Sequence, residues 1–139
     1  MTDDILVAKA QTVERCIARA REELAESVDF ATEFTRQDAA VLNVQRACEA
    51  TIDMAFRLVQ LEGLGAPANT REPFDQLTRA GLIDNALGEV LMKMVGFKNV
   101  AVHQYIDLDI TVVESVIRLS LDDLLTFSSV ALRLSPNAG

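Results

Sequence analysis

One short segment in the last third of the chain holds the residues best suited to chemistry. It ends with the only histidine, His103, and the only tyrosine, Tyr105, of the 139 residues. Lys98 and Asn99 stand just before them. A cation can hold a phosphate, an amide can orient it, and an imidazole can move protons near neutral pH. Together these side chains are suited to acid–base work on a phosphodiester.

The spacing decides which of these side chains can meet. If the chain is helical from about Asp84, Asn99 and His103 share one face because four residues separate them. Lys98 then lies about 140° from His103 around the helix, although its long stem can still bring its charge toward the same opening. Tyr105 would lie about 200° from His103 in a continuous helix. We therefore expect this helix to end near His103.

These residues also carry a family resemblance. Residues 98–105 resemble the signature of the HepT toxins, small helical proteins of the HEPN superfamily. In that pattern an Arg is followed by a polar residue, three further residues and then His-x-Tyr, which Asn99, His103 and Tyr105 match. Further similarity to the family lies in residues 43–50, 93–97 and 107–109.

The resemblance implies a toxin that is an endoribonuclease, a symmetric homodimer with its motifs paired in a central cleft. Cleaving RNA without a metal needs a base for the 2′-hydroxyl and an acid for the leaving oxygen. One chain offers one imidazole, so a second copy of His103 across a two-fold axis is the simplest supply. We expect Lys98 to clamp phosphate, Asn99 to orient it, and no cofactor to be needed. Whether tRNA or mRNA is cut stays open.

Tyr105 has a separate role by resemblance. HepT toxins are paired with MntA-type nucleotidyltransferase antitoxins, which neutralise them by adenylylation (AMPylation) of this tyrosine. An adenylyl group would bring negative charge and bulk to an anion-binding site and compete with RNA for Lys98. A hydroxyl that merely bonds the His103 ring or a backbone carbonyl is the plainer alternative for Tyr105.

One departure from the family pattern leaves two other functions open. Lys98 stands where the family has Arg, and a point charge does not replace a planar fork that grips phosphate bidentately. The chain could thus be a catalytically weakened or inactive helical partner of a nucleotidyltransferase. A helical dimer with a buried structural His103 is the third interpretation. The net charge of −8 also weighs against general RNA binding, unless basic groups gather in one cleft.

Length predicts one domain over residues 1–139, and helical periodicity together with the resemblance implies an all-α, up-down bundle of about five helices. Half of the residues are hydrophobic and only three are proline. No apolar run is long enough for a membrane span and the first residues are acidic, so we expect a cytoplasmic protein. Cys16 and Cys48 lie within helical patterns, which favours reduced core thiols.

Hydrophobic periodicity places the helices and assigns most charged residues to solvent. Glu23 falls on the charged face of the first helix. Phe30 and Phe34 should plug the first connection, and residues 35–38 resemble a capping box. Arg46 is a possible supporting cation for the cleft. The expected helices are about 4–26, 36–61, 73–80, 84 to near 103, and 109–132.

Glycine is costly inside a helix, by roughly 0.5–1 kcal/mol relative to alanine. Two glycines, Gly88 and Gly96, fall inside the helix that carries the motif. Gly96 precedes the motif by two residues, and we expect it to permit close approach of another backbone, from a partner subunit.

Overall fold

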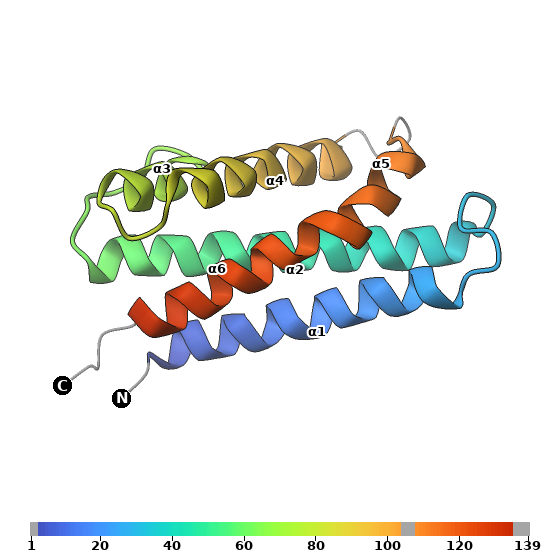
Figure 1. Ribbon diagram of the computed structural model, residues 1–139, viewed down its shortest axis with the longest axis horizontal. Coiled ribbons are helices and arrows are strands. Elements are labelled where there is room, and N and C mark those ends of the chain that lie inside the picture. Colours follow the sequence, from blue (N-terminus) through green and yellow to red (C-terminus); the bar gives the residue numbers. More distant parts are fainter. Residues whose placement is uncertain (1–2, 104–107, 135–139) are drawn as a thin grey trace.

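The computed structural model describes residues 3–103 and 108–134, and within them it contains helices and connecting turns but no strand. This confirms the all-α prediction. Four separate α-helices come first, and three contiguous helical segments then form the last part of the described chain (Figure 1). The elements are α1 (Asp4–Glu26), α2 (Phe34–Leu61), α3 (Glu72–Arg79), α4 (Asn85–His103), α5 (Ile110–Ser115), the π-helical η2 (Val116–Ser120) and α6 (Leu121–Leu134).

Helix α2 is the centre of the bundle, because α1, α3, α4 and α6 all pack against it. Helices α1 and α2 run antiparallel along their whole length, while α4 lies on the opposite side of α2 and α6 crosses it (Figure 1). Both cysteines are buried and free, as predicted. Phe74 of α3 and Phe127 of α6 meet edge to face, with ring centroids 5.5 Å apart, and tie the short helix to the last one.

Three helices begin where the sequence predicts, because an aspartate caps each one. Asp3 accepts a hydrogen bond from the backbone N–H of Leu6 at 3.1 Å, at the start of α1. At the start of α4, Asp84 accepts a hydrogen bond from the backbone N–H of Leu87 at 2.7 Å. At the start of α5, Asp109 accepts one from the N–H of Thr111 at 2.9 Å. Each carboxylate satisfies an amide that has no partner within its helix.

The start of α2 differs from the prediction. The helix begins at Phe34, and the capping box at residues 35–38 is wrong. Glu33 precedes the helix without a side-chain cap, since its carboxylate accepts from the Asp29 N–H at 2.6 Å and pairs with Arg36. Phe30 is buried as expected, but Phe34 is 72% exposed. As the first helical residue, Phe34 lies outside the turn that Phe30 closes.

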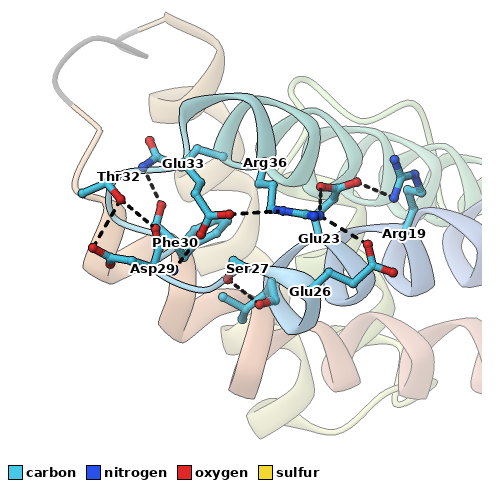
Figure 2. Close-up of polar contacts among 11 residues, drawn as sticks. Arg19, Glu23, Glu26, Ser27, Asp29, Phe30, Thr32, Glu33 and Arg36 are labelled. Atoms are coloured by element: carbon cyan, nitrogen blue, oxygen red, sulfur yellow. Dashed lines mark hydrogen bonds and ion pairs between the residues drawn. The ribbon is translucent and has the colours of Figure 1, made fainter.

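The expectation that Glu23 lies on the solvent-exposed charged face of α1 is wrong. Glu23 is 7% exposed and forms the centre of an ion-pair network (Figure 2). Its carboxylate pairs with Arg19 one turn earlier and with Arg36 of α2 at 3.1 Å. Arg36 also contacts Glu26 at 3.3 Å and Glu33 at 3.4 Å. These contacts compensate a buried charge and hold the α1–α2 turn.

The last helix is interrupted by one π-helical segment, which periodicity did not predict. Its residues Val116 and Ile117 are buried, whereas Leu119 is 73% exposed. Helicity then continues to Leu134, two residues beyond the expected end.

Candidate functional site

The motif occupies the last turns of α4, which is described as far as His103. The expected end of the helix near His103 adjoins residues outside the described part of the chain and stays a prediction. Asn99 and Lys98 are half-buried, and His103 is exposed. Tyr105 lies outside the described residues, so its predicted role is untested by the geometry.

Lys98 lies on the side of α4 that faces α2. Its charge acts on the buried thiol of Cys48, whose pKa is raised to about 12 by burial first, lowered in part by Lys98 and raised further by Glu49. Because a thiol with this pKa is neutral at physiological pH, Cys48 gives Lys98 no anionic partner. Lys98 is therefore a half-buried cation that forms no ion pair with any residue the structure describes.

His103 and Asn99 lie on a neighbouring flank of α4, one helical turn apart. His103 forms no hydrogen bond or ion pair with any other residue that the structure describes. Its exposure contradicts the interpretation of His103 as a buried structural histidine. An exposed imidazole beside an amide is able to reach a substrate and exchange protons with it.

Arg46 is not brought to the motif within one chain. It lines a groove of about 710 Å³ between α1 and α2, to which α4 contributes no residue. Arg15, Arg19 and Glu49 line the same groove. Its predicted role as a supporting cation would therefore require the groove of one chain to meet the motif of another.

A cation that the sequence analysis missed lies beside the motif instead. Arg71, the residue before α3, places its guanidinium over Gly96 of α4: a Cβ at position 96 would stand 2.7 Å from Nη2 of Arg71. The glycine admits a side chain of its own chain, so the expected partner backbone at Gly96 is wrong. The costly helical glycine was the signal, but the sequence does not say which residue fills its space.

Some of the cations without an ion pair lie close to the motif. Seven of the thirteen Lys and Arg side chains form ion pairs with described residues. The other six form none among residues 3–103 and 108–134, and three of these six lie on or against α4. The six are Arg15, Arg46, Arg71, Lys93, Lys98 and Arg133.

Metal and membrane features were searched in the same residues. Among them no group of three or more His, Cys, Asp or Glu side chains could hold a metal ion. None of the described helices is long and apolar enough to span a bilayer.

The bundle and the motif at the end of α4 define the class of the protein. A family model described as ribonuclease HepT-like matches residues 13–131. The chain therefore belongs to the HepT-like family, and its HEPN fold is the one expected from the motif.

One relative and two solved structures are similar to the chain over most of its length. The mRNA nuclease HepT of Shewanella oneidensis is 38% identical over 92% of this chain and 96% of its own. The tri-AMPylated HEPN toxin of Shewanella oneidensis in complex with an MNT antitoxin superimposes with a TM-score of 0.87, at 38% identity over 92% of this chain and 96% of that chain. A toxin–antitoxin structure with AMP-PNP gives a TM-score of 0.88, at 37% identity over 93% and 98%.

Proposed function

We propose that this chain is the toxin of a toxin–antitoxin pair, an endoribonuclease that cleaves RNA by acid–base catalysis without a metal. The observation that carries the proposal is the exposed His103 one turn beyond Asn99, at the end of α4. The HepT-like family and the relative named an mRNA nuclease support it, and favour mRNA over tRNA as substrate. Such an enzyme would act in the cytoplasm, where its two thiols stay reduced.

The cleavage step assigns one proton transfer to each of two imidazoles. One removes the proton of the ribose 2′-hydroxyl, whose oxygen attacks the adjacent phosphorus. The other protonates the 5′-oxygen, which leaves as a hydroxyl and gives a 2′,3′-cyclic phosphate. Lys98 stabilises the negative charge that builds on the phosphate, and Asn99 orients it.

A homodimer supplies the second imidazole, because each chain has only one histidine. Exposed hydrophobic side chains on α4, α5 and η2 support an interface at these elements. In the described part of the chain eight large hydrophobic side chains are exposed, and four of them lie on these elements: Val100, Val102, Val112 and Leu119. A two-fold axis near the end of α4 would bury them and bring two copies of His103 into one cleft.

Tyr105 is the proposed modification site, two residues beyond His103. Its phenolic oxygen would attack the α-phosphorus of ATP, held by an MntA-type nucleotidyltransferase, and release pyrophosphate. The AMP left on Tyr105 would carry a negative phosphate to the cations that otherwise hold RNA. The AMPylated toxin complexed with its antitoxin is the relative that supports this step.

A second function is favoured by Lys98. Its half-buried position against Cys48, about 140° around α4 from His103, suits a chain that binds a nucleotidyltransferase without cleaving RNA. In that case the loss of the family Arg would mark lost activity.

RNA cleavage in EDTA by the purified chain separates the two functions. The nuclease proposal expects cleavage by the wild type and its loss in His103→Ala, with a cyclic phosphate on the product. If the wild type and His103→Ala behave alike while Lys98→Arg gives cleavage, the chain is an inactive partner.

A further inference from the structure

The guanidinium of Arg71 lies on the same flank of α4 as the motif. It rests over Gly96, which precedes Asn99 by three residues and His103 by seven, and both spacings return to one face of a helix. Lys98 lies on another side, toward Cys48. Of these two cations, Arg71 is therefore the one that shares a flank with His103.

The backbone of Arg71 is held by hydrogen bonds, whereas its guanidinium forms no ion pair with any described residue. Its N–H donates to Oδ1 of Asn69 at 3.0 Å, and its carbonyl accepts from the N–H of Phe74 at 3.2 Å. The side chain is exposed and forms no ion pair with any described residue. By contrast, Arg79 at the other end of α3 pairs with Asp75 at 3.0 Å.

Two glycines of α4 make room for α3 on this flank. Side-chain atoms of Thr78 fill the place of a Cβ at Gly88, as Arg71 does at Gly96. The short helix thus runs antiparallel to α4 and carries Arg71 toward the end that holds the motif. A guanidinium without an ion pair among the described residues, on the same flank of α4 as His103 and Asn99, is suited to grip a phosphate bidentately.

We propose that Arg71 binds an RNA backbone phosphate next to the one that is cleaved, which rests on the proposed nuclease function. Gly96 and His103 are about 10 Å apart along the helix axis. The guanidinium would therefore contact a flanking phosphate and not the phosphate that is cleaved. Arg71 would supply a bidentate grip on phosphate that Lys98 cannot provide. It is a substrate-binding residue, and its loss weakens RNA binding more than it slows the chemical step.

The test is the salt dependence of RNA binding, measured by fluorescence anisotropy with a labelled single-stranded RNA of mixed sequence. All proteins carry His103→Ala so that the RNA stays intact. Arg71→Ala should weaken binding about tenfold at moderate salt and reduce the slope of log K against log salt by about 0.7, the value for one phosphate contact on a single strand. Arg79→Ala removes the same charge from the other end of α3 and should leave the slope within error.

Equal effects of Arg71→Ala and Arg79→Ala would overturn the proposal, because they would reflect net charge alone. So would an unchanged slope, or no binding of this RNA by the parent protein. If Arg71→Ala does not fold by circular dichroism, Gly96→Ala decides, since its methyl group displaces the guanidinium and keeps the charge. Unchanged affinity in Gly96→Ala would then overturn the proposal.

Cleavage by proteins that retain His103 separates this inference from the function beneath it. Arg71→Ala should raise KM with kcat nearly unchanged, and a fall in kcat at constant KM would contradict a flanking phosphate. If the wild type cleaves through His103 while Arg71→Ala changes neither constant nor slope, only the Arg71 proposal fails. If nothing is cleaved but the slope falls in Arg71→Ala, the nuclease proposal fails and the RNA contact stands.

Discussion

The charge of Lys98 on α4 acts on the buried thiol of Cys48 on α2, and this thiol is neutral at physiological pH. Burial raises the pKa of Cys48 to about 12, against the opposing effect of the lysine charge. Cys48 therefore gives Lys98 no anionic partner, and Lys98 forms no ion pair with any residue in the described ranges. A half-buried cation without an anionic partner is costly unless a ligand supplies the anion.

Replacing Lys98 should change catalysis in two directions. Lys98→Ala should lower kcat by about 10²-fold, in line with the loss of one group that stabilises transition-state charge. Lys98→Arg should raise kcat/KM severalfold, because a guanidinium forms two bonds to phosphate. Cleavage of a labelled RNA under single-turnover conditions measures both.

Lys93→Ala is the matched control for Lys98, since it removes the same charge from an exposed position on α4. Its kcat should stay within a factor of about two of the wild type, because only the screened field changes. Equal losses in the two variants would show that Lys98 acts through net charge and has no contact with the reacting phosphate.

The buried carboxylate of Glu23 should matter for stability. Glu23→Gln removes the centre of the network that joins Arg19 and Arg36, and should lower the free energy of unfolding by about 1–3 kcal/mol. Its neighbour Glu22 is 55% exposed and also contacts Arg19. Glu22→Gln should change stability by less than about 0.5 kcal/mol. Urea denaturation of both variants tests this, and similar midpoints would contradict a special role for Glu23.

The start of α1 should make stability depend on acid. Hydrogen bonds from Arg57 to Asp3, the nearer at 2.7 Å, lower the pKa of the Asp3 carboxyl below 3.8. A lowered pKa contributes stability above the unfolded value near 3.8, and this contribution is lost as the pH falls through the lower folded value. Asp3→Asn should be less stable than the wild type at neutral pH.

That difference should shrink as the pH falls below 3.8, because the wild type then loses the same charge. Urea midpoints of the wild type and Asp3→Asn across this range are the measurement. A difference that stays constant at every pH would show that Asp3 acts only as a neutral helix cap.

The two glycines of α4 should respond differently to alanine. Gly96→Ala meets only the flexible end of Arg71, so the better helix propensity should stabilise the chain by about 0.5–1 kcal/mol. Gly88 is buried against Thr78, whose hydroxyl donates to the Phe74 carbonyl at 2.7 Å. Gly88→Ala should therefore destabilise by about 1–3 kcal/mol through overpacking. Thermal melts of both variants decide, and a gain from Gly88→Ala would contradict the close packing of α3 on α4.

The helix bounds and the spacing of the motif could be predicted from the sequence because they depend on residues that are close together in the chain. Helical periodicity predicted the bounds of α1, whose first turn is capped by Asp3. The starts of α4 and α5 were predictable because the carboxylates of Asp84 and Asp109 cap them. The spacing of Asn99 and His103 likewise depends only on the helix that carries them. Predictions of this kind need no knowledge of which helices touch.

Tertiary contacts decided what the sequence could not show. Glu23 is buried because Arg36, thirteen residues later, reaches its carboxylate. The space at Gly96 is filled by Arg71, twenty-five residues earlier and separated from it by a helix. The pattern of one helix carries no information on either partner. Charge patterning therefore assigned Glu23 to solvent, and the cost of a helical glycine assigned the space at Gly96 to another subunit.

The central claim is that two copies of His103 share one cleft, and mixing subunits tests it most directly. Wild type and His103→Ala chains are unfolded together, refolded at varied ratios and assayed for RNA cleavage at constant total protein. If both imidazoles of a dimer are needed, activity follows the square of the wild-type fraction, so an equal mixture keeps about a quarter of the activity. Activity proportional to the wild-type fraction, about half in an equal mixture, would contradict the shared cleft.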